Sequence, residues 1–163
     1  MADTQKGVTT DLIDIIRLLI ILAMKKIKLQ HILYLTAFLA FGIGDGITGA
    51  LMMNSKGIGM EANPIVRILF MARGIEGVMT GKMWLTFIIL AATYIVQLNS
   101  PNMYWTVNGF LIAITVGGLM AVNANITAMA GQIPTEPGAL ILAYLILMFI
   151  LTEIGSFVDG KAH

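Results

Sequence analysis

Four long apolar segments constrain this chain more than any other feature of its sequence. They cover residues 29–53, 78–98, 106–130 and 139–158, and each holds the roughly 20 mostly apolar residues that a helix needs to cross a bilayer. Only 12% of the 163 residues are charged, whereas an ordinary soluble domain carries about 25%. The sequence therefore predicts an all-α fold, a four-helix transmembrane bundle whose first partner is the lipid bilayer.

Two shorter segments outside these spans also have helical patterns. Between Thr10 and Lys28 the charged residues recur on one broad helix face, which is typical of an amphipathic helix lying at the membrane interface. Docking on another subunit explains the same pattern equally well. In the first loop, Asn63 suits a helix cap and Pro64 the first turn, so a short interfacial helix is expected there. The predicted organisation is an N-terminal segment 1–28, a transmembrane domain 29–158 and a C-terminal tail 159–163.

The distribution of lysine and arginine predicts the orientation of the spans, because these residues are retained on the cytoplasmic side. If the amino terminus is inside, the cytoplasmic side carries six of them and the outer side carries three. The six are Lys6, Arg17, Lys25, Lys26, Lys28 and Lys161, and the three are Lys56, Arg67 and Arg73. Both termini are therefore predicted to be cytoplasmic.

Composition removes several classes of function. A net charge of +1, with no long basic stripe, gives no footprint for DNA or RNA, so no nucleic-acid partner is expected. The absence of cysteine excludes disulfides, thiolate metal sites and iron–sulfur clusters. The only histidines are His31 and His163, which argues against a histidine-based zinc, copper or di-iron site made by this chain alone.

Polar side chains inside the predicted spans are the most informative residues, because each charge costs about 2.5 to 3.5 kcal/mol in the bilayer centre. Asp45 lies about four residues past the middle of the first span, and Lys82 lies about six residues before the middle of the second. Asn123 lies about five residues past the middle of the third. Since neighbouring spans run antiparallel, these three share one depth, whereas Glu153 falls in the opposite half of the membrane.

The surroundings of Asp45 indicate that it faces another helix. Gly42, Gly46 and Gly49 form a stripe of small residues beside it, and such stripes allow helices to approach closely. The sequence predicts an ion pair between Asp45 and Lys82 that is hydrogen-bonded to Thr48 and Asn123. Such a group is either an internal clamp that fixes helix packing or a site for an ion or substrate. If Lys82 extends to the interface instead, Asp45 needs another partner.

The spacing of these residues resembles a family of small prokaryotic polytopic membrane proteins that is classed only as a domain of unknown function. The pattern has an intramembrane Asp followed by Thr three residues later, a Glu-x-Asn-Pro loop, a lysine in the next span and an asparagine in the third span. The matching residues are Asp45 and Thr48, Glu61, Asn63 and Pro64, Lys82, and either Asn123 or Asn125. The match covers about the middle two-thirds of the chain. The resemblance brings no assigned activity or cofactor, but it implies a prokaryotic cytoplasmic membrane and adds Glu61 and Asn63 to the polar cluster.

Three functions are compatible with these features. The first is a non-catalytic accessory or structural subunit of a larger membrane complex, such as a membrane oxidoreductase or another energy-converting assembly, with other membrane subunits or further copies of the chain as partners. The second is an ion- or proton-coupled transport element in which Asp45, Glu61 and Lys82 exchange partners. The third is an enzyme whose carboxylates Asp45 and Glu61 hold a hard cation with help from Asn63 and Asn123. Nothing in the sequence indicates catalysis by this chain alone.

Overall fold

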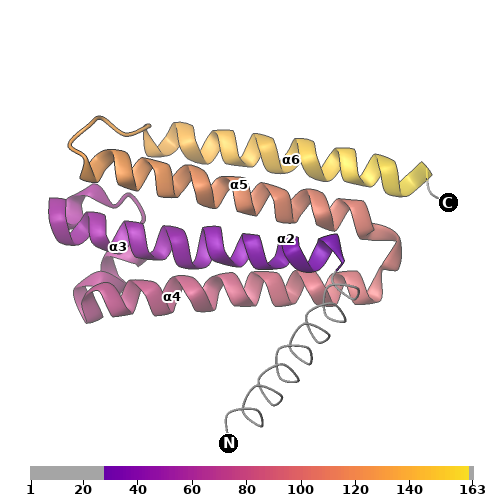
Figure 1. The fold of residues 1–163 in the computed structure, drawn as a ribbon, viewed down its shortest axis with the longest axis horizontal. Coiled ribbons are helices and arrows are strands. Elements are labelled where there is room, and N and C mark those ends of the chain that lie inside the picture. Colours follow the sequence, from indigo (N-terminus) through magenta and orange to yellow (C-terminus); the bar gives the residue numbers. More distant parts are fainter. Residues whose placement is uncertain (1–27, 162–163) are drawn as a thin grey trace, which may run out of the picture. The chain divides into compact units, whose positions relative to one another are not determined.

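The computed structural model describes residues 28–161, and within them every regular element is a helix (Figure 1). The elements are α2 (Leu29–Ala37), the π-helix η1 (Phe38–Gly44), α3 (Asp45–Lys56), the 3₁₀-helix η2 (Ile58–Met60), α4 (Pro64–Asn99), the 3₁₀-helix η3 (Pro101–Met103), α5 (Tyr104–Met129) and α6 (Pro137–Lys161). Four stretches are long and apolar enough to cross a membrane: Leu29–Lys56, Pro64–Asn99, Pro101–Met129 and Pro137–Lys161. The predicted all-α class is confirmed, and the four predicted spans correspond to four packed helices that are long and apolar enough to cross a membrane. The predicted amphipathic helix at 10–28 lies outside the described residues except for Lys28, which precedes α2.

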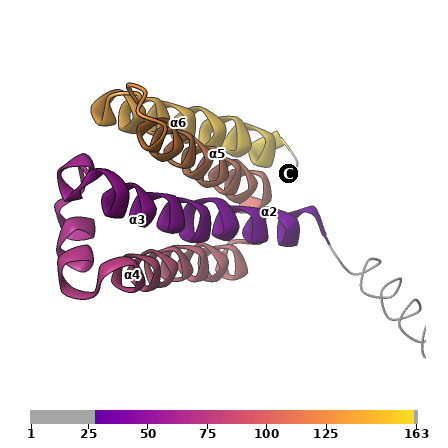
Figure 2. The same ribbon diagram turned by 60° about the vertical axis from the view of Figure 1, so that its left-hand side comes forward.

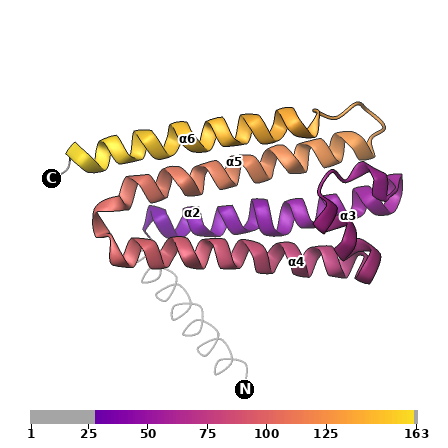
Figure 3. The same cartoon turned by 180° about the vertical axis from the view of Figure 1, so that it is seen from behind.

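From residue 33 onward the spans pack side by side in a row (Figures 1 and 3). α4 packs on η1 and α3, these pack on α5, and α5 packs on α6. The four predicted helices are therefore packed together, with α5 as the principal neighbour of α6. The reason lies in α5, which presents glycines to both sides: Gly118 lies against the backbone of Phe41, and Gly117 lies against the ring of Tyr144.

The first span is not a regular α-helix. Residues Phe38–Gly44 form a π-helix, and the backbone N–H of Asp45 donates to the carbonyl of Ala40, five residues earlier. Each π turn holds one residue more than an α turn, so the side chains after it are rotated about the helix axis. Gly42, inside the π-helix, lies against Thr86 of α4, and Gly46, just after it, lies against Lys82. Nothing in the residue pattern predicted the π-helix.

α4 consists of two helical segments joined at Gly74. This glycine has φ 58° and ψ −142°, a left-handed conformation that favours glycine over any residue with a β-carbon. Leu69 lies against Gly77 and Gly81, although in a straight helix it would be about 12 to 18 Å away from them along the axis. The segment from Pro64 to Gly74 therefore folds back on the long segment, and Figure 2 shows this change of direction.

The short first segment of α4 begins where the sequence predicted. The side chain of Asn63 caps it, because the Ile65 N–H donates to Asn63 Oδ1 at 2.9 Å. Pro64 follows in the first helical position, where its missing N–H leaves no hydrogen bond unmade. The predicted short helix in this loop is thus present, continuous in sequence with the second span.

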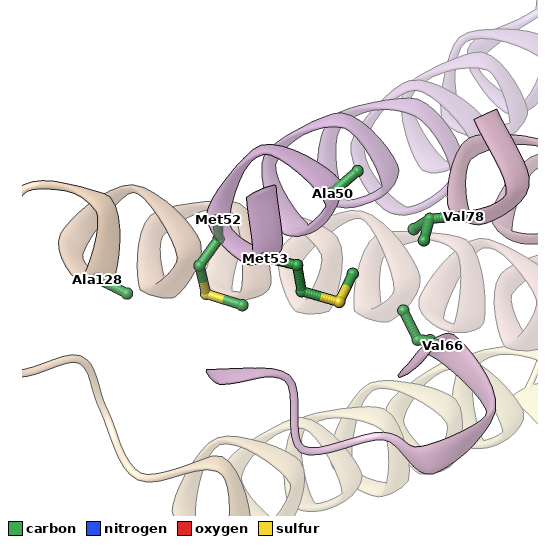
Figure 4. Packing of buried hydrophobic residues seen from close by; sticks show 6 residues of the cluster. All are labelled: Ala50, Met52, Met53, Val66, Val78 and Ala128. Atoms are coloured by element: carbon green, nitrogen blue, oxygen red, sulfur yellow. The ribbon is translucent and has the colours of Figure 1, made fainter. Parts of the chain in front are cut away.

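Two apolar clusters lie at different depths along the spans. One contains Ala50, Met52, Met53, Val66, Val78 and Ala128 and joins α3, both segments of α4 and the end of α5 (Figure 4). The other contains Ala37, Leu90, Val107, Leu111 and Ile114 and lies towards the start of the first span. Asp45 and Lys82 lie in sequence between the residues of these two clusters on their respective spans. Along the helix axes, these two polar residues therefore have an apolar cluster on either side.

A residue of α6 caps the start of α5. The Asp159 carboxylate accepts hydrogen bonds from the Trp105 N–H at 2.9 Å, from the Thr106 N–H at 2.8 Å and from the Thr106 hydroxyl at 2.7 Å. A negative charge at this position also complements the helix dipole. α6 itself ends at Lys161, within the segment 159–163 that was predicted to be a C-terminal tail.

Replacing Asp159 with alanine is expected to lower the free energy of unfolding by about 1 kcal/mol, the usual effect of losing a helix cap. The Asp159→Asn variant keeps one acceptor oxygen, so it should lose less. Thermal unfolding of the purified protein in mild detergent measures both. Ser156→Ala, an exposed change one turn earlier in α6, is the matched control, and equal midpoints for this control and Asp159→Ala would contradict the capping role.

Candidate functional site

An ion pair between Asp45 and Lys82 joins the first two spans, as predicted. Lys82 Nζ donates to Asp45 Oδ2, and the two side chains are only 17% and 8% exposed, respectively. The two helices are close together beside the pair, since a β-carbon at Gly46 would lie in van der Waals contact, at 3.5 Å, with the β-carbon of Lys82. Two buried opposite charges stabilise each other in a medium of low dielectric constant, but each becomes costly if the other is removed.

The amide that reaches this pair is Asn125, not Asn123. Asn125 Nδ2 donates to Asp45 Oδ1 and to Thr48 Oγ1, both at 3.1 Å, and the Thr48 hydroxyl donates to the Gly44 carbonyl at 2.9 Å. The Asn123 side chain is exposed. Two residues are separated by about 200° around a helix, so only one of the two asparagines can face α3. The predicted depth placed both asparagines near Asp45 along the membrane normal, but it did not indicate which of them lies on the face of α5 that contacts α3.

Replacing Asn125 with leucine is expected to lower the free energy of unfolding by about 1 to 3 kcal/mol, because Asp45 Oδ1 and the Thr48 hydroxyl both lose a donor. Asn123→Leu is the matched control, two residues away on the exposed face, and it should change stability by less than about 0.5 kcal/mol. Thermal unfolding in the same detergent compares them. Equal effects of the two substitutions would remove Asn125 from the cluster.

The loop before α4 holds Glu61 in place through local hydrogen bonds. Glu61 Oε1 accepts from the Asn63 N–H at 2.8 Å, and the Arg67 side chain donates from Nε to the Glu61 carbonyl. No lysine, arginine or histidine among residues 28–161 forms an ion pair with the Glu61 carboxylate. This carboxylate is therefore the one charge of the cluster without a counter-ion in the described part of the chain.

Three polar side chains converge above Gly49. From the point where a β-carbon on Gly49 would lie, Asn125 Nδ2 is 3.4 Å away, and Asp45 Oδ1 and Glu61 Oε2 are each 3.9 Å away. Any larger residue at this position would occupy the space between these groups. The sequence identified Gly49 only as part of a packing stripe, so its role in leaving this space open was missed.

The cluster forms part of the wall of a cavity of about 590 Å³. Asp45, Glu61, Lys82 and Asn125 line it together with Asn63 and apolar residues of α3, η2, α5 and the start of α6. Among the apolar residues are Met52, Met60, Ile65, Leu140 and Ile141. These were not predicted as site residues, because an apolar side chain in such a chain gives no signal that separates a cavity wall from a lipid-facing surface.

The cluster offers few ligands to a metal ion. Among residues 28–161, no three histidine, aspartate or glutamate side chains come together in a way that could hold one. Asp45 and Glu61 supply two carboxylates, and one oxygen of Asp45 already accepts from Lys82.

Comparisons with models of known protein families, with curated proteins and with solved structures give no match to this chain.

Proposed function

We propose that this chain, whose four apolar helices suggest an integral membrane protein, is an ion- or proton-coupled transport element built on Asp45, Glu61 and Lys82. The supporting observation is the cavity that these residues line together. It contains one carboxylate paired with an ammonium group and a second carboxylate that has no counter-ion among residues 28–161. A group that served only as an internal clamp would need neither the second carboxylate nor the open space.

The charges suggest how coupling works. Two carboxylates and one ammonium group leave a net charge of −1, which a proton or a monovalent cation neutralises. Lys82 can leave Asp45 only if Asp45 receives another cation or a proton, because an unpaired buried charge costs several kcal/mol. Entry of the cation and movement of the Lys82 side chain towards Glu61 are therefore linked steps.

Flux into liposomes tests this function. The purified full-length protein is reconstituted into liposomes that contain a pH-sensitive dye. A proton, sodium or potassium gradient is then applied across the liposome membrane. The wild type should give flux well above empty liposomes, and both Asp45→Asn and Glu61→Gln should lower it at least tenfold. Glu76→Gln removes an exposed carboxylate of α4 outside the cavity and should leave flux unchanged. Equal flux in the wild type and the two cluster variants would count against the proposal.

We also propose that the chain belongs to the family it resembles, and that it lies in the cytoplasmic membrane of a prokaryote with both termini inside. In support, the motif residues Asp45, Glu61, Asn63 and Lys82 all line one cavity. Because the chain has no cysteine, single cysteines can be introduced at Lys56 and Asn99, which are exposed at the ends of helices. A membrane-impermeant thiol reagent should label Lys56→Cys on intact cells and Asn99→Cys only after permeabilisation, and the reverse pattern would invert the orientation.

A specific feature of α6 supports a second role as a non-catalytic subunit of a larger membrane complex. Glu153 is exposed on this helix beside the exposed apolar residues Ile150, Ile154 and Phe157. It lies about 12 Å from the end of α6 at Lys161. A carboxylate facing lipid at this depth is costly, and a polar donor on a partner helix would satisfy it. Isolation of the native protein in mild detergent decides between the roles: a chain that purifies alone, with Glu153→Leu unchanged in stability, argues against a partner.

A further inference from the structure

We infer that the cavity binds an amphiphilic primary amine, with the ammonium head at Glu61 and Asp45 and an apolar body along Ile65, Leu140 and Ile141. This inference rests on the proposed function, since it names the class of cation that the same site accepts. The size of the cavity, the charge of its polar wall and the chemistry of its apolar wall each support it.

The cavity is larger than a bare ion at the two carboxylates would need. A volume of about 590 Å³ is far above the roughly 30 Å³ that one water molecule occupies in the liquid. It falls within the range of about 300 to 1,000 Å³ that is typical of sites for organic ligands. A bare proton or alkali cation would leave most of this space unused.

The polar wall selects a positive head. Glu61 directs Oε2 towards the space above Gly49, where Asp45 Oδ1 lies at the same distance of 3.9 Å. An ammonium group has three N–H donors and no acceptor, so it suits a space that is bordered by carboxylate oxygens. An anionic head would be repelled by Glu61, and an uncharged head would leave this carboxylate without a counter-ion.

The apolar wall selects the rest of the ligand. Met52, Met60, Ile65, Leu140 and Ile141, which line the cavity, have only hydrocarbon or thioether side chains. Each methylene of an alkyl chain buried against such a surface increases affinity about fourfold. A hydrophilic amine would gain nothing from these contacts, so the combined site fits a molecule with one charged end and one apolar end.

Binding to the full-length protein in nanodiscs of uncharged phosphatidylcholine tests the inference. Butyl-, hexyl-, octyl- and decylammonium are titrated while the midpoint of thermal unfolding is recorded, with decanol and sodium chloride as probes that lack the charge or the chain. We expect protection by the ammonium series that strengthens about fourfold per methylene, and no protection by decanol or sodium chloride. Equal protection by decanol would overturn the charged head, and equal protection by sodium chloride would overturn the organic ligand.

Variants separate binding in the cavity from general partition into the lipid. Glu61→Gln should weaken decylammonium binding at least tenfold, Ile141→Trp should remove the dependence on chain length by filling the cavity, and Glu76→Gln should bind like the wild type. Unchanged binding in Glu61→Gln would refute the inference. Amine binding without ion flux would support the amine inference and contradict the transport proposal. Ion flux without amine binding would support the transport proposal and contradict the amine inference.

Discussion

Replacing Asp45 with asparagine is expected to lower the free energy of unfolding by about 3 to 5 kcal/mol, the usual effect of removing one partner of a buried ion pair. The substitution keeps the size of the side chain, so the loss comes from the charge. Lys82, only 17% exposed, would then carry an uncompensated charge. Thermal or denaturant unfolding in mild detergent measures the change.

A double variant separates the lost charge from lost packing. In Asp45→Asn combined with Lys82→Gln, no charge is left unpaired, and stability should return to within about 1 to 2 kcal/mol of the wild type, since neutral replacement of a whole buried pair is often tolerated. Lys82→Gln alone should be nearly as harmful as Asp45→Asn alone. If the two single changes were simply additive in the double variant, the ion pair would contribute no coupling energy.

Replacing Gly118 with alanine is expected to destabilise the protein by about 1 to 3 kcal/mol, although it adds only one methyl group. The new β-carbon would lie 2.6 to 2.8 Å from backbone atoms of Ala40 and Phe41. Backbone atoms cannot rotate away as a flexible side chain can, so η1 and α5 would have to separate. The same detergent unfolding assay reports the loss.

Gly160→Ala is the matched control for this prediction. Gly160 lies in α6, has no positive φ, and a β-carbon there would meet no atom within 4 Å. Alanine in an open helical position stabilises by about 0.4 to 1 kcal/mol, because it restricts the unfolded chain. The same substitution should therefore have opposite signs at the two positions. Equal effects would show that helix propensity, and not the contact with η1, governs Gly118.

The sequence predicted the spans and the central ion pair because both depend on simple geometry. Spans follow from hydropathy and helix length, which local composition records directly. The pairing of Asp45 with Lys82 follows from equal depth in antiparallel spans, together with a glycine stripe that lets the helices approach. The cap of α4 was predictable for a similar reason, since Asn63 and Pro64 act within a single turn.

Features that depend on helix rotation or on partners distant in sequence were beyond prediction. The choice between Asn123 and Asn125 requires the angular position of α5 relative to α3, which depth does not give. The capping of Trp105 and Thr106 by Asp159 joins residues more than 50 positions apart, and a lone aspartate near a helix end carries no mark of its partner. The order of helices in the row is set by close contacts at glycines that the sequence shows only as glycines.

The π-helix at Phe38–Gly44 affects how the first span would align with a regular helix. Its hydrogen bonds run from residue i to i+5, so a π turn accommodates one residue more than an α turn. The first span thus behaves as two helices that share an axis and differ in phase, and Asp45 opens the second of them. A related protein with an uninterrupted α-helix in this span should lack one residue between positions 38 and 44. An alignment that places its gap in a loop instead would assign Asp45 the wrong counterpart.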